Sequence, residues 1–287
     1  MRTHKLFLMK DKIDYIREEL EKTGFPLELE IYSILWNDDW IPTTQDFYFD
    51  EDEQKGRFID ISSIQMPKFT QTWEIINPLK PLYISYNLAI ECKKSSEDNW
   101  VFFPIDDYYV NHDGQTHSTI RDKINNVSFW NHITGQGFAH YNPTKNKIAS
   151  LYTIFPKGKN DIFEATMQLI KYISYEKSKI KPRNGKNDIQ SLWFPIIVFD
   201  GKMWNVFFKD GILNEIKESN HTILKCRYRS NITGDAEGYC IDVVNKKYFV
   251  DILKIIKNDI DELVNDLLKN NKKGLKNIIK IFDIKKD

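Results

Sequence analysis

Gly56-Arg57-Phe58-Ile59-Asp60-Ile61 and Leu88-Ala89-Ile90-Glu91-Cys92-Lys93 are the two stretches that decide the fold. Each has the apolar run of a buried β-strand, yet each carries charge. Asp60 lies inside the first run, and Glu91 and Lys93 end the second. Because a buried carboxylate is costly unless it is paired or binds a metal, the two stretches together predict a cation site suited to hydrolysis.

The spacing of these residues predicts which of them share a face. Residues i and i+2 of a strand point to the same side, so we expect Glu91 and Lys93 together and Cys92 turned the other way into packing. Asp60 on a neighbouring strand would add a second carboxylate. Two simpler alternatives stay open: Asp60 pairs with Arg57 or caps a strand, and Glu91 forms an ordinary ion pair with Lys93.

Around these stretches the periodicity predicts an ordered series of elements. Their expected ranges are helices at 10–22 and from Pro26 to about Asn37, strands at 46–49, 57–64, 82–92 and 100–103, a helix at 161–175, a buried strand at 193–199, strands at 203–208 and near 222–228 and 239–244, and a long helix at 246–269. A polar turn at 95–99 and an Asp200-Gly201 hairpin are expected between strands. The order helix, three strands, helix, strand predicts an α/β protein with a mixed central sheet flanked by helices.

This order and these motifs resemble the PD-(D/E)XK nuclease superfamily over residues 24–104, and in topology alone over 160–200. In that family a strand Asp and a Glu-x-Lys on the next strand hold Mg²⁺, and here Asp60, Glu91 and Lys93 stand in those places. The proline that the family often has before the Asp is absent, because Ile59 stands there. The resemblance implies a restriction-endonuclease-like core.

The resemblance also implies a metal site. Asp60, Glu91 and the backbone carbonyl of Cys92 would hold Mg²⁺ or Mn²⁺, since hard oxygen ligands suit these ions. Glu28, at the start of the second helix, would reach the metal through water, although the helix dipole alone also favours an acid there. Glu30 is the alternative, because a one-residue error in helix phase exchanges the two. Lys93 would assist the attacking water.

The function implied is that of a metal-dependent deoxyribonuclease with DNA as its partner, in a defence or restriction role. The alternative is a catalytically silent module on the same fold that binds nucleic acid or protein. A homodimer or a partner subunit is compatible with both. We expect one nuclease domain at 1–245 with an insertion at about 106–160, and a C-terminal helical extension at 246–287 whose apolar stripe packs on the sheet or on a partner.

Composition sets the remaining limits. The chain has 287 residues with 41 basic and 41 acidic side chains, so the overall excess of basic residues typical of nucleic-acid binding is missing. Basic strips at 171–186 and 270–287 are where phosphates would be met. Three cysteines without a CxxC pair favour a reducing compartment and exclude a thiolate zinc site. With no membrane-length run, a cytoplasmic protein without a membrane partner is expected.

Other motifs are weaker. Gln168 and Lys171 lie three apart on the second core helix, where they could face phosphates or solvent. Four histidines of the insertion match no zinc spacing: His112, His117, His132 and His140. Gly135-Gln136-Gly137 opens no dinucleotide loop. Three aromatic residues of the insertion would stack on bases or pack in a core: Trp130, Phe138 and Tyr141.

Overall fold

The computed structural model describes residues 2–65, 82–105, 148–156, 160–179, 188–229 and 236–270. Helices in these ranges are α1 (Arg2–Glu21), α2 (Phe25–Asn37), α5 (Asp161–Lys179) and α6 (Phe249–Asn270), the last preceded by the 3-10 turn η4 (Lys246–Tyr248). The strands are β1 (Ile41–Asp50), β2 (Lys55–Gln65), β3 (Leu82–Ile105), β4 (Ile148–Phe155), β5 (Asp188–Lys209), β6 (Ile212–Glu218), β7 (His221–Arg229) and β8 (Ala236–Asn245). The histidines, the glycine pair and the three aromatic residues of the insertion lie outside the described residues.

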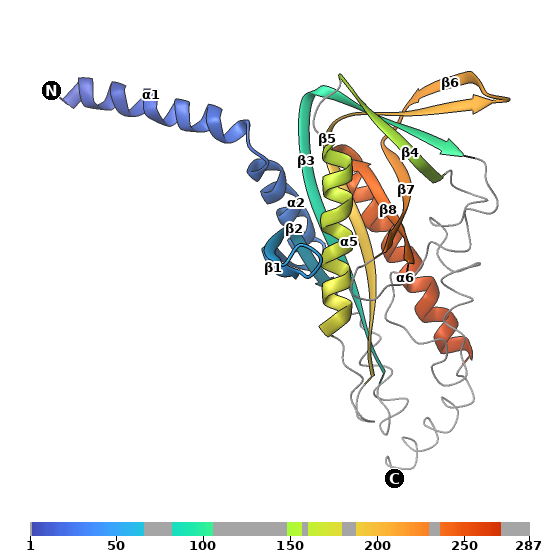
Figure 1. The fold of residues 1–287 in the computed structure, drawn as a ribbon. Helices are drawn as coiled ribbons and strands as arrows, with labels where there is room; N and C mark the ends of the chain where they lie inside the picture. Colours follow the sequence, from blue (N-terminus) through green and yellow to red (C-terminus); the bar gives the residue numbers. More distant parts are fainter. Residues whose placement is uncertain are drawn as a thin grey trace, which may run out of the picture.

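The described strands form one mixed sheet of eight, which confirms the α/β class (Figure 1). β1, β2 and β3 form an antiparallel meander. After α5 the chain returns as β5, which pairs parallel to β3, and β8 pairs parallel to β5. α2, β1 to β3, α5 and β5 follow one another in the predicted order, but β4, which the sequence analysis did not predict, lies between β3 and α5 within the expected insertion. The pairings of β3, β4, β7, β8 and β5 close on themselves as a circuit.

Two predicted turns are wrong, because β3 and β5 are single long strands that bend together. No turn interrupts β3 at 95–99 and no hairpin forms at Asp200-Gly201. Lys94 pairs with Asp200 and Asn99 with Lys202, so four residues of β3 bulge opposite Gly201 alone. A Cβ on Gly201 would meet the Phe199 ring and lie 2.7 Å from the Ser95 carbonyl oxygen. Glycine thus permits a close approach of two backbones here, not a chain reversal.

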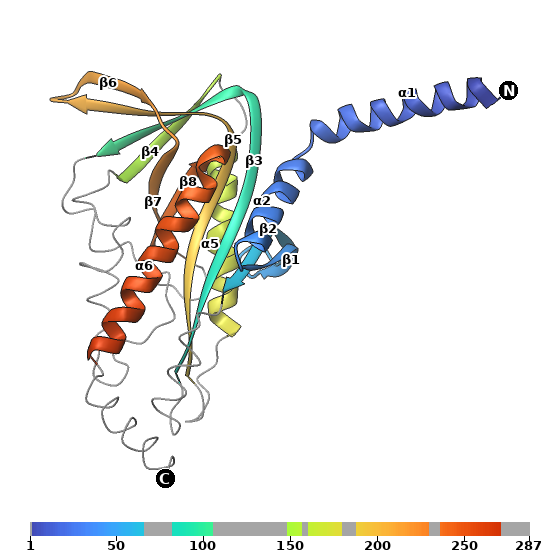
Figure 2. The same cartoon turned by 180° about the vertical axis from the view of Figure 1, so that it is seen from behind.

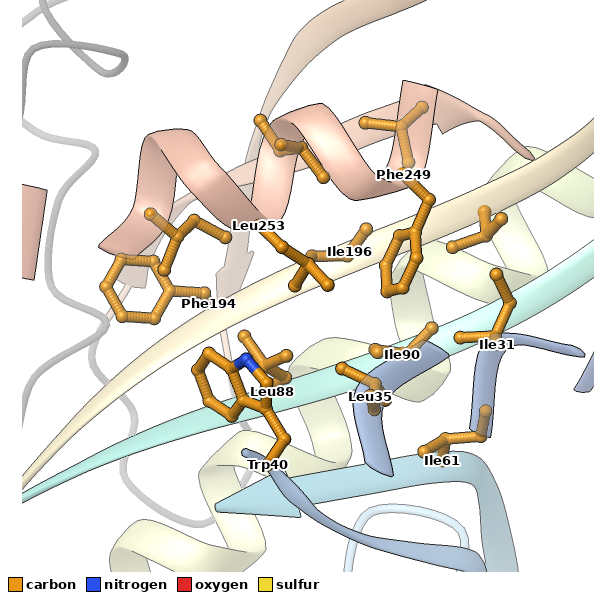
Figure 3. Close-up of a cluster of buried hydrophobic side chains, with 14 of the residues drawn as sticks. Ile31, Leu35, Trp40, Ile61, Leu88, Ile90, Phe194, Ile196, Phe249 and Leu253 are labelled. Carbon is orange, nitrogen blue, oxygen red and sulfur yellow. The ribbon is translucent and has the colours of Figure 1, made fainter. Parts of the chain in front are cut away.

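Helices cover both faces of the sheet. α2 and α6 lie on one face and α5 on the other (Figures 1 and 2). Figure 3 shows the first core, in which Ile31 and Leu35 of α2 and Phe249 and Leu253 of α6 meet strand residues such as Ile90. The predicted stripe of the last helix is buried at Phe249, Ile252, Ile256 and Ile260. Over these residues the stripe packs on the sheet, so it is not left for a partner.

The packing face of α5 differs from the expected one. The periodicity predicts a face of Phe163, Met167 and Ile170, but the structure leaves Phe163 half exposed and buries Ile162 and Leu169 instead. The helix carries two overlapping apolar stripes at helical spacing. Contact with β1, β3 and β5 selects the one that includes Ile162.

Among the helices that the structure describes, none is both long enough and apolar enough to cross a lipid bilayer.

We predict that Gly201→Ala lowers the free energy of unfolding by about 1–3 kcal/mol, the usual cost of overpacking a tight site. Phe199 has little room to move because its ring stacks on Trp100 at 3.8 Å between centroids. Gly56→Ala is the matched control, since a Cβ there meets only the ring of half-exposed Phe47, at 2.6 Å. Urea unfolding of both variants measures the difference. Equal losses would contradict the tight bend at Gly201.

Candidate metal centre

The candidate centre lies where β2 and β3 separate. Their antiparallel ladder ends at the pair Ile61 and Ile90. One residue further, the Asp60 carboxylate accepts the backbone N–H of Cys92 at 2.8 Å through Oδ2. A side chain of β2 therefore satisfies a donor of β3 at the point where the backbone pairing stops.

β1 is distorted at the same level. Gln45, opposite Asp60, has a φ of 51°, and neither residue appears in the β1–β2 pairing although Thr44 and Asp46 on either side do. A left-handed backbone costs a non-glycine residue roughly 1–3 kcal/mol. The Gln45 amide donates to Glu28 Oε2 at 3.0 Å. The distortion thus brings an amide of β1 to an acid of α2.

Packing shows on which face the charged residues lie. Ile61 and Cys92 both pack in the core formed with α2 and α6. Because side chains alternate along β3, Glu91 and Lys93 project from the opposite face, toward α5, and Cys92 points away from them as expected. Alternation does not place Asp60 on that face, because Ile59 packs in the core beneath α5 and Ile61 in the core beneath α2, so the strand changes its inward face at Asp60.

Glu91 is the most constrained residue of the centre. Its side chain has no solvent exposure. Oε2 accepts a hydrogen bond from Lys93 Nζ at 2.8 Å, whereas Oε1 has no hydrogen-bond partner among the residues described. Burial, and then the negative charge of Asp60, raise the pKa of Glu91 to about 8 against the opposing effects of Lys93 and, more weakly, of the Asp60 backbone N–H. The ion pair expected as the simpler alternative forms, but it satisfies only half of this carboxylate.

Burial and neighbouring charges also shift the pKa values of Asp60 and Lys93. Burial raises the pKa of Asp60, and Lys93 and the Cys92 N–H only partly offset it. Burial alone would lower the pKa of Lys93, but the negative charges of Glu91 and Asp60 outweigh this effect, so the pKa is raised. Asp161, the first residue of α5, acts on Lys93 in the same direction. The centre thus combines acids with one partly exposed ammonium group.

The structure favours Glu28 over Glu30 as the acid from the second helix. Glu28 is buried, and its pKa is raised by burial and by the charge of Asp60. Glu30 is half exposed and pairs with Lys246 at 3.3 Å. Glu28 comes from α2, which covers the face opposite to α5, so it approaches Asp60 from the side of the sheet opposite to Glu91.

Two basic residues lie elsewhere. Arg57 contacts Asp50 at 2.8 Å and Glu53 at 2.7 Å, so the simpler alternative in which it pairs with Asp60 does not form. Lys171 of α5 binds the same two acids, at 2.8 and 2.6 Å. This network ties α5 to the β1–β2 hairpin, and it occupies the lysine considered for phosphate contacts.

Sequence patterns did not indicate two residues that lie near the centre. Gln45 lies in a polar strand, and its backbone conformation is set by its neighbours. Asp161 looks like an ordinary acid in the first turn of a helix, where the dipole favours it. Only the tertiary structure brings Asp161 near Lys93.

The donor set partly fits a hard cation. Glu91 Oε1 is a buried oxygen without a partner among the described residues, and the Asp60 carboxylate is near enough for its charge to act on Glu91. Across the described ranges, however, no three His, Cys, Asp or Glu side chains are grouped closely enough to hold a metal ion. Lys93 would have to release Glu91 Oε2 to some extent, and Glu28 would act only through water.

Comparison of the chain with protein-family models, with curated proteins and with solved structures gave no match. No family is therefore shown, and what bears on function is the geometry of these side chains.

We predict that the free energy of unfolding falls as the pH rises from about 5 to about 8. Glu91 titrates near 4.5 when unfolded and near 8 when folded, so the folded state holds its proton longer and loses that advantage over this range. Glu91→Gln should flatten the fall, because the amide does not titrate. Urea unfolding at several pH values measures the slope.

The control is Glu97→Gln at an exposed position of β3, which should keep the wild-type slope. An unchanged slope in Glu91→Gln would show that Glu91 is not the buried titrating group.

Proposed function

We propose that the chain is a metal-dependent nuclease that hydrolyses phosphodiester bonds of DNA with Mg²⁺ or Mn²⁺. One observation carries the proposal. Asp60 and Glu91 lie near each other at the end of the β2–β3 ladder, with a buried Glu91 oxygen that lacks a partner in the described residues and the Lys93 ammonium beside it. Burying these charged groups costs free energy of folding, so such an arrangement favours a functional role over a purely structural one.

The arrangement of the sheet supports a restriction-endonuclease-like core within this proposal. α2 precedes an antiparallel β1–β2–β3 meander, and β4 and α5 lie in sequence between β3 and β5, which runs parallel to β3. The acids lie on the middle and third strands of the meander, as the resemblance implies. The defence or restriction role rests on that resemblance alone.

The side chains have distinct roles in this proposal. Asp60, Glu91 and the Cys92 carbonyl would hold the cation, which when bound supplies Lewis acidity to the phosphate and acidifies a water. Lys93, whose ammonium is partly exposed, would orient that water and balance charge that develops on the phosphate. Glu91 must lose its proton first, since only the carboxylate binds a metal well.

Glu28 has a supporting role. Its Oε2 is held by Gln45, and its pKa responds to the charges of both Asp60 and Lys93. From the α2 side it would position a water of the cation and would not bind the cation directly. Loss of Glu28 should therefore weaken activity less than loss of Asp60.

Plasmid cleavage with Mg²⁺ tests the proposal. Asp60→Ala and Lys93→Ala should each lower the rate by about a hundredfold or more, the usual effect of removing a group that stabilises charge or transfers a proton. Lys254→Ala, at an exposed lysine of α6 on the other face of the sheet, should cleave like the wild type. Circular dichroism checks that all variants are folded. Equal cleavage by all of them would refute the assignment.

The Glu91–Lys93 contact favours a second candidate, a catalytically silent binding module on the same fold. The ion pair at 2.8 Å and the absence of a convergent group of three ligands in the described residues would suit a site that balances its charges without a cation. The two candidates differ in metal affinity.

Calorimetric titration with Mn²⁺ separates them. The nuclease should bind the ion with a Kd below about 1 mM, and more tightly at pH 8 than at pH 6, because binding must displace the proton of Glu91. Asp60→Asn should abolish the heat. A wild-type protein that gives no heat at either pH would support the silent module.

A further inference from the structure

α2 is apolar on two sides. Its inner side supplies Leu27, Ile31 and Leu35 to the core. Its outer side carries an apolar stripe at spacings of four, three and four residues: Phe25, Leu29, Tyr32 and Trp36. Phe25, Leu29 and Trp36 are 55%, 60% and 61% exposed, whereas Tyr32 is partly buried, packing against the core and stacking on Trp36. An exposed stripe of large apolar side chains at this spacing is the surface that a second helix covers.

α1 carries a matching stripe. Ile13, Ile16 and Leu20 lie on one side of the helix and are each about half exposed. In the sequence, Leu6 and Met9 continue the same alternation of three and four residues toward the N-terminus. Figures 1 and 2 show α1 projecting away from the sheet and its other helices. The chain thus holds two apolar helix faces of the same periodicity, and the described residues cover neither.

α1 does not fold back over α2 of its own chain but points away from it (Figures 1 and 2). Only residues 22–24 separate the two helices. Lys94 of β3 donates to the carbonyl of Glu21, the last residue of α1, at 2.8 Å. This contact fixes the end of α1 on the sheet, with the rest of the helix directed outward.

The charges of the two helices disfavour pairing of α1 with α1. α2 contains no Lys or Arg, and of its two acids Glu28 is buried and Glu30 pairs with Lys246. The positions beside the α1 stripe are mostly basic: Lys5, Lys10, Lys12 and Arg17. Pairing of α1 with α2 therefore brings these basic residues to a helix without Lys or Arg, whereas two copies of α1 would bring like charges together.

We propose that two copies of this chain form a dimer by exchanging α1, so that the outer stripe of α2 in each copy receives α1 of the other. The contact is made twice across a two-fold axis. It covers both exposed stripes at once, and it does not depend on the nuclease activity.

Light scattering after size exclusion, over a range of protein concentrations, tests the proposal. The wild type should be a dimer. Ile16→Asp in α1 and Trp36→Asp in α2 should each weaken dimerisation about tenfold or more, because a charge replaces a buried apolar side chain. Leu151→Asp changes an equally exposed leucine on β4 and should leave the dimer intact.

Mixing the two variants gives the sharper result. A mixed dimer pairs α1 of the Trp36→Asp copy with α2 of the Ile16→Asp copy, both unaltered, so mixing should restore dimers that neither variant forms alone. A monomeric wild type would overturn the proposal. So would a dimer that only Ile16→Asp disrupts and mixing does not restore, which is the outcome for pairing of α1 with α1. A dimer that resists both substitutions would overturn it as well.

Discussion

The buried carboxylate of Glu91 is the constraint on which the rest of the site depends. β3 lies between β2 and β5, so a side chain at this position is shielded by the sheet and by α5, and its charge has no contact with water. Lys93 satisfies one oxygen and leaves the other without a protein partner among the described residues. A hydrophobic residue would fit this position at lower cost. The acid is thus accounted for if the second oxygen has a ligand to bind.

The fold supplies what this carboxylate needs. The β2–β3 ladder ends at Ile61, which brings the preceding residue, Asp60, beside the backbone of Cys92. α5 starts near Lys93 with Asp161, and α2 approaches the same point from the opposite face with Glu28. The helices and strands around the centre also form the apolar cores on the two faces of the sheet. The geometry of the centre therefore depends on the stability of the whole sheet.

Much of the fold could be predicted because periodicity records which faces are buried. The strands carrying Asp60 and Glu91, the parallel return of β5 and the stripe of α6 all follow from apolar patterns. The Asp200-Gly201 pair predicts a hairpin, whereas the structure has a bend there. An Asp-Gly pair is compatible with both backbone geometries, and the close approach of the neighbouring strand β3 selects the bend. The face of α5 was ambiguous between two stripes. Sequence patterns placed Asp60, Glu91 and Lys93 on neighbouring strands, but they could not reveal Gln45 or Asp161, whose positions depend on tertiary contacts.

A crystal of the wild type grown with Mn²⁺, with anomalous diffraction recorded near the manganese absorption edge, tests the central claim most directly. We expect an anomalous peak between the carboxylates of Asp60 and Glu91, with Glu91 Oε1 among the ligands. A crystal with Mn²⁺ in the solvent but no peak there, and with Glu91 still bound only to Lys93, would contradict the proposed metal centre.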